Sequence, residues 1–231
     1  MIRMNNMSKI SLLVITDGRL DCIKETLSAL ESFHELDMFH QRIILNDNLH
    51  DEYQEKLQEL YGDRYEIHRN IPKGGFDGAI RSGWELISED AEYIFHLEED
   101  FALRKPVHFS DMISILSEHP EIVQIALKRQ PATKYEEDCG GIVEKNPDGY
   151  TELETPYGIV STHREFFTTN PSLYRRSLLE YGFPSQHPPE LRMTERLTLD
   201  PNNVFAFWGK KFDPPTVFHV GHSRNPESFG Y

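Results

Sequence analysis

The sequence predicts an α/β fold in which one mostly parallel sheet is flanked by helices. Within the first hundred residues, short apolar runs alternate with segments where apolar residues recur every three or four positions. Strands separated by helices in this way imply right-handed crossovers and a sheet covered on both faces. The length of 231 residues and the 38% hydrophobic content favour one large globular domain.

The predicted elements follow in a regular order. Strands are expected at residues 10–16, 42–45, 65–68, 93–97 and 123–127. Helices are expected at residues 20–30, 53–60, 80–87, 109–116, 173–181 and 190–197. Residues 129–169 are rich in Gly, Pro, Thr and Glu without clear periodicity, which predicts irregular hairpins or a mobile lid. Residues 205–231 are expected to form an extended tail.

Composition excludes several classes of protein. With 24 basic and 38 acidic side chains the formal charge is −14, which disfavours loose attachment to DNA, RNA or anionic lipid but leaves room for a local basic groove. Cys22 and Cys139 are the only cysteines, too few for a disulfide framework or a cysteine zinc site. The longest early apolar run is too short for a signal peptide or a spanning helix. We therefore expect a cytoplasmic protein that does not contact membranes.

Acidic residues follow three predicted strands. Asp17 and Asp47 come after the first two, and Glu98, Glu99 and Asp100 follow the strand at residues 93–97. Parallel strands bind ligands at their carboxyl ends, so these side chains should surround one crevice. Grouped carboxylates repel one another unless cations balance them, and a divalent metal would relieve that cost. The alternative is a solvated acidic turn.

A glycine-rich segment precedes the third predicted helix. It runs from Asn70 to Trp84 and contains Gly74, Gly75, Gly78 and Gly83. Glycines permit close backbone approach, and a helix N-terminus offers unpaired N–H groups to an anion. The segment matches neither a P-loop nor a dinucleotide-binding fingerprint. An ordinary turn between a loop and a helix is the alternative.

Together these segments resemble the nucleotide-sugar half of family 2 glycosyltransferases with the GT-A fold. The resemblance covers about the first hundred residues, through residues 10–17, Asp47, residues 70–83 and residues 97–100. It implies a Rossmann-like GT-A domain at residues 9–231, preceded by a flexible leader at residues 1–8. Residues 9–104 would bind the nucleotide sugar, and residues 105–231 would bind the acceptor, with a mobile segment around residues 130–165.

The resemblance also implies the roles of individual residues. Those expected to bind the nucleotide sugar are Thr16, Asp17, Arg19, Asp47, Gly74, Gly75, Arg81, Glu98 and Arg224. The expected ligands of an Mn²⁺ or Mg²⁺ ion are Asp100, His219 and His222, although either histidine also suits an ordinary strand or loop position. Two features depart from the family pattern. Glu98 replaces the first Asp of the Asp-x-Asp motif, and Thr16-Asp17-Gly18-Arg19 replaces Pro-x-Tyr-Asn.

The family places a catalytic base after a segment that ends in Gly-Phe, here Gly182-Phe183. Glu195 is the better match in position, and Glu190 is the other candidate. Either residue also suits the exposed face of a helix. With one of them as base, the resemblance implies an inverting transfer of a sugar from a nucleoside diphosphate sugar, UDP-linked in most relatives, to a hydroxyl group.

The resemblance leaves the acceptor open between a glycan and a hydroxymethylated base in phage DNA. With the DNA base as acceptor, the protein would act in the host cytoplasm. Two other classes of function remain. One is a catalytically silent protein that binds nucleotide sugars or carbohydrate. The other is a nucleotidyltransferase, disfavoured because no Gly-rich, Lys-containing loop directly follows the first strand.

Overall fold

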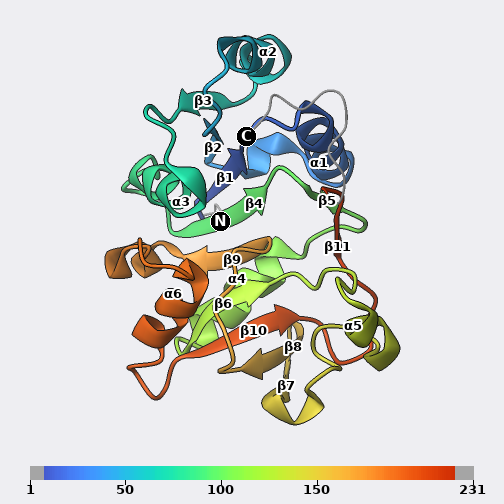
Figure 1. Ribbon diagram of the computed structural model, residues 1–231. Helices are drawn as coiled ribbons and strands as arrows, with labels where there is room; N and C mark the ends of the chain where they lie inside the picture. The colour runs from blue at the N-terminus through green and yellow to red at the C-terminus, as the bar shows by residue number, and fades with distance from the viewer. Residues whose placement is uncertain (1–7, 222–231) are drawn as a thin grey trace, which may run out of the picture.

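A nine-stranded sheet forms the centre of the structure, a computed structural model that describes residues 8–221 (Figure 1). The first seven residues of the predicted leader lie outside this range. The strands follow the order β3-β2-β1-β4-β9-β6-β10-β8-β7. Their bounds are β1 Ile10–Thr16, β2 Gln41–Asn46, β3 Glu66–Arg69, β4 Tyr93–Glu98, β6 Ile122–Ala126, β7 Tyr150–Thr155, β8 Gly158–His163, β9 Ser172–Arg175 and β10 Val204–Trp208.

A small second sheet pairs β5, Phe101–Leu103, with β11, Val217–His219, in antiparallel fashion. The α-helices are α1 Leu20–Phe33, α2 Asp51–Tyr61, α3 Gly75–Glu85, α4 Phe109–Glu118, α5 Lys134–Cys139 and α6 Pro189–Leu197. No helix within residues 8–221 has both the length and the apolar character needed to cross a membrane.

Most strands of the large sheet run in one direction. β3, β2, β1 and β4 are mutually parallel, and β6 and β10 share their direction because β9 lies antiparallel between β4 and β6. Only β8 and β9 run the opposite way, since β7 is antiparallel to β8. The predicted α/β class, with a mostly parallel central sheet flanked by helices, is confirmed.

Side-chain alternation along the strands creates two core layers. Leu12 and Val14 of β1 pack with apolar residues of α1, α2 and α4 on one face. Leu13 of β1 belongs to the core layer on the other face, which includes Ile80 of α3 and Met193 of α6. The helices therefore cover both faces of the sheet, and its strand ends remain open to ligand.

One predicted element is wrong. Residues 173–181 do not form an α-helix, because Ser172–Arg175 is strand β9 and Arg176–Tyr181 is a 3₁₀-helix. Strand β9 pairs with both β4 and β6, and the side chains of Leu173 and Tyr174 are buried in the core layers on opposite faces of the sheet. A short run that is buried on both faces lacks the alternation of a half-exposed strand, so its periodicity cannot distinguish the two structures.

The segment predicted as irregular hairpins or a lid contains regular structure. It holds the helix α5 and the hairpin of β7 and β8, and β8 pairs with β10 at the edge of the large sheet. His163, at the end of β8, is only 5% exposed and stacks on Phe207 with ring centroids 5.3 Å apart. Burial lowers the pKa of His163 from 6.5 to about 4.

We predict that His163 makes the fold sensitive to acid. The pKa of its imidazole is lower in the folded state than in the unfolded chain, so the unfolded state binds a proton first as the pH falls. The fold therefore keeps its full stability above pH 6.5 and loses stability as the pH falls towards 4. The total loss of unfolding free energy from this residue is about 3 kcal/mol. Urea unfolding at pH 7 and pH 4.5 should show a smaller loss of stability for His163→Phe than for the wild type. The control is His68→Gln, because the His68 side chain is 40% exposed. Equal losses in the wild type and His163→Phe would contradict this assignment.

Candidate functional site

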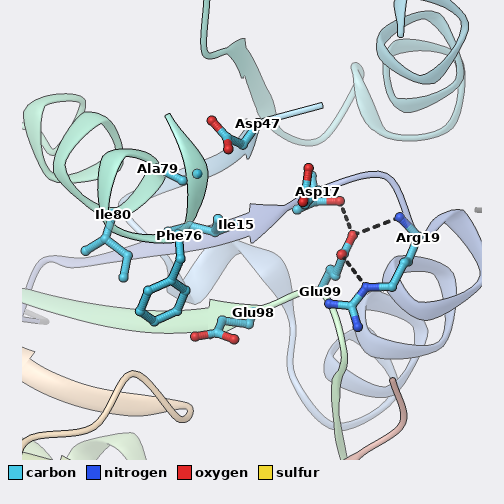
Figure 2. A pocket seen from close by; sticks show the side chains of 11 residues that line it. Ile15, Asp17, Arg19, Asp47, Phe76, Ala79, Ile80, Glu98 and Glu99 are labelled. Carbon is cyan, nitrogen blue, oxygen red and sulfur yellow. Dashed lines mark hydrogen bonds and ion pairs between the residues drawn. The ribbon is translucent and has the colours of Figure 1, made fainter. Parts of the chain in front are cut away.

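A first cavity of about 230 Å³ opens at the carboxyl ends of β1, β2 and β4, beside the N-terminus of α3 (Figure 2). It brings together six of the residues expected to bind the nucleotide sugar. These are Thr16, Asp17, Arg19, Asp47, Gly75 and Glu98. Phe76, Ala79 and Ile80 of α3 supply an apolar wall, and Glu99 completes the other side.

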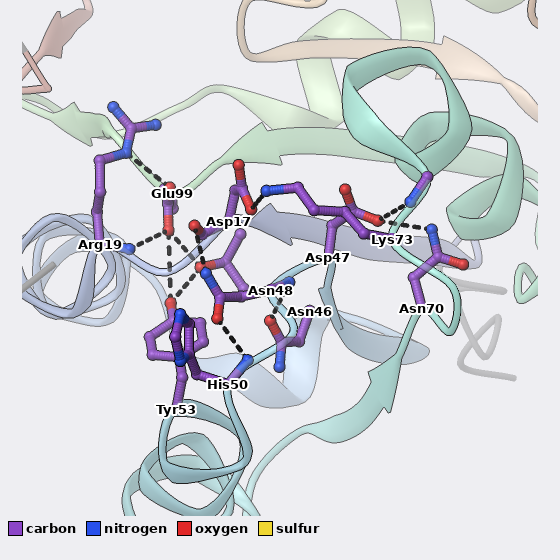
Figure 3. Close-up of polar contacts among 12 residues, drawn as sticks. Asp17, Arg19, Asn46, Asp47, Asn48, His50, Tyr53, Asn70, Lys73 and Glu99 are labelled. Carbon is purple, nitrogen blue, oxygen red and sulfur yellow. Dashed lines mark hydrogen bonds and ion pairs between the residues drawn. The ribbon is translucent and has the colours of Figure 1, made fainter. Parts of the chain in front are cut away.

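Asp47 shapes the loop that leads into α3 (Figure 3). The residue is 2% exposed, and its Oδ1 accepts hydrogen bonds from Asn70 Nδ2 at 2.7 Å and from the Gly74 backbone N–H at 2.8 Å. Lys73 of the same loop contacts Asp17, with Nζ 2.5 Å from Oδ1. Burial raises the pKa of Asp17, and the Lys73 ammonium opposes that increase. The loop is thus fixed to two strand ends before any ligand binds.

The three consecutive carboxylates point to three different places. β4 ends at Glu98 and the chain enters β5 at Phe101, so the acidic residues lie where the backbone turns. Figure 2 shows Glu98 towards Phe76 in the cavity and Glu99 towards Arg19. Asp100 faces β11. The three carboxylates therefore do not converge on one point. Within residues 8–221, no group of three or more His, Cys, Asp or Glu side chains is placed to hold a metal ion.

Glu99 belongs to a buried polar network (Figure 3). Its Oε2 accepts a hydrogen bond from the Thr16 hydroxyl, which also contacts the hydroxyl of Tyr53. Arg19 donates to Oε1 through Nε at 2.7 Å. Burial raises the pKa of Glu99 despite the charge of Arg19, and burial also raises the pKa of Tyr53. The sequence assigns Glu99 only to the acidic strand end and Tyr53 only to the apolar face of a helix, so neither was predicted as a site residue of its own.

Asp100 lies between a cation and an imidazole. Its Oδ2 is 2.8 Å from Arg19 Nη1 and 2.7 Å from His219 Nε2. Burial raises the pKa of Asp100, but the hydrogen bond from His219 and the charge of Arg19 outweigh it and leave the pKa below its ordinary value. Asp100 Oδ1 is buried and has no hydrogen-bond partner within residues 8–221. A carboxylate with an unpartnered oxygen beside an imidazole is a donor set that suits Mn²⁺ or Mg²⁺, so these two residues fit such an ion.

A second cavity of about 620 Å³ adjoins the first, and Phe76 and Glu98 line both. His219 and Glu190 also line the second cavity. Its remaining walls are aromatic, aliphatic and polar side chains, among them Phe101, Phe166, Phe167, Thr168, Thr169, Asn170 and Leu191. Arg129 contributes a cation to this wall, but Glu136 pairs with it at 2.8 Å.

The two glutamates proposed as base lie in different surroundings on α6. Glu190 faces the second cavity, and its Oε1 accepts hydrogen bonds from the Thr169 backbone N–H at 2.7 Å and hydroxyl at 3.0 Å. Burial raises the pKa of Glu190, and the nearby charge of Glu98 adds to this effect. Glu195 has a side chain that is 53% exposed and pairs with Arg192 at 2.7 Å, and it lines neither cavity.

Two further expected residues, Gly74 and Arg81, line neither cavity. Gly74 donates its backbone N–H to Asp47 Oδ1. Arg81 on α3 donates to Asp77 at 2.7 Å and to the Pro184 carbonyl at 3.3 Å, so it connects α3 to the segment before α6. His222 and Arg224 lie outside the described residues.

The chain has the fold of GT-A glycosyltransferases. It is similar to the crystal structure of S. aureus TarS 1–349 in complex with UDP-GlcNAc, with a TM-score of 0.64 and 16% identity over 96% of this chain and 61% of the other. It is also similar to GalNAc-T7 with UDP, GalNAc and Mn²⁺, with a TM-score of 0.69 and 11% identity over 97% of this chain and 45% of the other.

A third structure, TarS 1–349 in complex with UDP, matches with a TM-score of 0.60 and 15% identity over 91% of this chain and 60% of the other. The chain thus spans about three fifths of the TarS 1–349 structures and less than half of GalNAc-T7. At such identities the similarity shows the fold. No protein-family model matches the chain, and no curated protein matches its sequence.

We predict that Gly74 is required for the loop that Asp47 holds. A Cβ at this position would lie 2.5 Å from Asn70 Nδ2 and 2.8 Å from the carbonyl carbon of Gly78. Gly74→Ala should therefore lower the free energy of unfolding by about 1–3 kcal/mol, as overpacking does elsewhere. Gly78→Ala is the matched control, because its Cβ would meet only Arg81 Nη2 at 3.7 Å. Urea unfolding measures both variants, and equal effects would count against the close approach.

Proposed function

We propose that the protein is a glycosyltransferase that moves a sugar from a nucleoside diphosphate sugar, preferably a UDP-sugar, to a hydroxyl acceptor. One observation supports this most directly. The first cavity, at the strand ends, adjoins the second across Glu98, and His219, which lines the second cavity, contacts Asp100. A nucleotide and an acceptor would then meet at one point, and the structures that resemble this chain contain UDP or UDP-GlcNAc.

The first cavity is proposed to hold the nucleotide. Asp17 and Asp47 line it and present carboxylate oxygens, either of which suits the single N–H group of uracil in a nucleotide. Its apolar wall of Phe76, Ala79 and Ile80 excludes water from one side. The diphosphate would then extend past Glu98 towards Asp100 and His219, where the second cavity begins.

Asp100 and His219 would hold a divalent cation. When bound, the ion supplies Lewis-acid stabilisation of the negative charge on the departing diphosphate. His219 is fixed for this role by Gln130, which accepts from the His219 backbone N–H at 2.8 Å and donates to its carbonyl at 2.9 Å. The ring of Phe101 packs against the imidazole with centroids 4.9 Å apart. These contacts set where the imidazole meets Asp100.

Glu190 is the proposed general base. It lies in the second cavity, and Thr169 holds one of its oxygens with two hydrogen bonds. Its raised pKa makes the carboxylate a stronger base than an exposed glutamate. Glu190 would take the proton of the acceptor hydroxyl as that oxygen attacks the anomeric carbon, which implies inversion. The position of Glu195 on the exposed face of α6 disfavours it for the same role.

A glycan is the proposed acceptor. The second cavity combines aromatic rings with hydroxyl, amide and carboxylate groups, which suits stacking and hydrogen bonding to a sugar. Its cation Arg129 is paired with Glu136, while Glu98 and Glu190 add negative charge. A phosphate backbone would be repelled there and by the net charge of −14. Duplex DNA with hydroxymethylated bases is therefore the second acceptor to assay.

We expect the wild type to release nucleoside diphosphate from at least one UDP- or GDP-sugar in the presence of Mn²⁺. Asp100→Asn should reduce the rate about 100-fold or more, because the loss of a metal-binding carboxylate removes stabilisation of the leaving group. Asp138→Asn is the control, since Asp138 has a 61% exposed side chain on α5.

The outcomes of this assay separate the three classes of function. No release by the wild type, with UDP bound, would indicate a silent binding protein. Consumption of a nucleoside triphosphate with release of pyrophosphate would indicate a nucleotidyltransferase. Equal rates for Asp100→Asn and the wild type would contradict the role of Asp100.

We also predict that Glu190→Gln reduces transfer about 1,000-fold, a typical scale for the removal of a general base, while UDP still binds. In the wild type the rate should rise with pH through the raised pKa of Glu190, because only the carboxylate accepts the proton. Glu195→Gln should keep its rate within about two-fold, since surface changes away from a site have small effects. Rates from pH 4 to pH 8 test both variants. Loss of activity in Glu195→Gln alone would reverse the assignment.

A further inference from the structure

Arg19 occupies an unusual place at the first cavity. It is the N-cap residue of α1, directly after the loop that follows β1. Its side chain is 17% exposed and lines the first cavity. Figure 2 shows the guanidinium beside Glu99, on the side of the cavity opposite Phe76. The protein therefore places a fixed positive group where the acidic residues follow β4.

Two carboxylates hold the guanidinium in one orientation. Arg19 Nε is 2.7 Å from Glu99 Oε1, and Nη1 is 2.8 Å from Asp100 Oδ2. The Arg19 backbone N–H also donates to Glu99 Oε2, at 3.2 Å. Glu99 is itself held by Thr16 and Tyr53. A planar guanidinium bound at two edges keeps its direction, unlike a flexible ammonium group.

Arg19 supplies part of the positive charge that a metal ion would otherwise supply to these carboxylates. Carboxylates grouped at a strand end need a cation, and Arg19 already supplies one to Glu99 and Asp100. The backbone also packs closely here, since a Cβ at Gly221 would lie 2.4 Å from both Arg19 Nη1 and Asp100 Oδ2. The positive charge is thus built into the site, beside the carboxylate that would bind the metal.

We propose that Arg19 is a resident cation for the diphosphate of the sugar donor, and that it shares Asp100 with the divalent ion. The proposal rests on the proposed function. Arg19 would neutralise part of the negative charge of the diphosphate when no metal is bound. The affinity for the nucleotide would then depend only partly on the ion. The positive charge of Arg19 also repels a divalent ion at Asp100, so its removal should strengthen metal binding in the absence of nucleotide.

Calorimetric titration of the full chain with UDP tests the first part. In EDTA the wild type should bind UDP at least about ten-fold more tightly than uridine, because charge-assisted hydrogen bonds to the diphosphate persist without metal. Arg19→Met should weaken UDP binding in EDTA about ten-fold or more and weaken it less in Mn²⁺. The UDP affinity of Arg19→Lys in EDTA should lie between those of the wild type and Arg19→Met, because lysine keeps the positive charge. Arg42→Met is the control, since Arg42 pairs with Asp37 on the surface.

Titration with Mn²⁺ alone tests the second part. Arg19→Met should bind Mn²⁺ more tightly than the wild type, a gain that a merely structural role for Arg19 would not produce. Unchanged or weaker Mn²⁺ binding would overturn the shared use of Asp100. Thermal unfolding checks that the variant folds. Should it not fold, the wild-type comparison of UDP with uridine still tests the first part. Arg19→Gln, which removes the charge and keeps hydrogen-bond donors, then tests the second part by the same expected gain in Mn²⁺ affinity.

The results also separate this inference from the proposed function. Equal affinity of the wild type for UDP and uridine in EDTA, with UDP bound tightly in Mn²⁺, would overturn the role of Arg19 and leave the glycosyltransferase proposal intact. Equal UDP binding by Arg19→Met and the wild type in EDTA would do the same. Failure of the wild type to bind UDP under either condition would overturn both.

Discussion

The arrangement at the strand ends depends on the ion pairs that Arg19 makes with Glu99 and Asp100. Both carboxylates are nearly fully buried, and a buried charge is costly unless it is paired and hydrogen-bonded. Arg19 meets that requirement from the N-terminus of α1, while Tyr53 of α2 and His219 of β11 complete the contacts. These polar contacts therefore fix three separate segments, α1, α2 and β11, to the end of β4, in addition to the apolar packing of the core.

The same contacts give Glu98, Glu99 and Asp100 three different surroundings. Glu99 and Asp100 turn away from the first cavity wall formed by α3, so Glu98 is the acidic side chain that faces both cavities. Its charge contributes to the raised pKa of Glu190 across the second cavity. A carboxylate at the junction thus affects the basicity of the proposed base, which links the two halves of the site without a direct bond.

The sequence predicted correctly those features that depend on the residues of a single segment. The strand at residues 10–16, the loop before α3 and the acidic strand end were all predictable, because period and residue type are local properties. Strand β9 was not, since its burial depends on β4 and β6. Neither was the choice between Glu190 and Glu195, which depends on how α6 packs. The divergence of the three carboxylates likewise follows from the turn into β5, and residue type alone does not encode it.

The net charge of −14 makes these local cations more important. A protein of this charge repels an anionic donor at long range, but salt screens that repulsion over about 8 Å at physiological ionic strength. Binding must then depend on groups in direct contact with the diphosphate. Arg19 and Lys73 are both held by carboxylates at the first cavity, so their positions are set before a ligand arrives. Among residues 8–221, Arg129 is the one Lys or Arg that lines the second cavity, and Glu136 pairs with it, which is consistent with an anion on the donor side and a neutral acceptor opposite it.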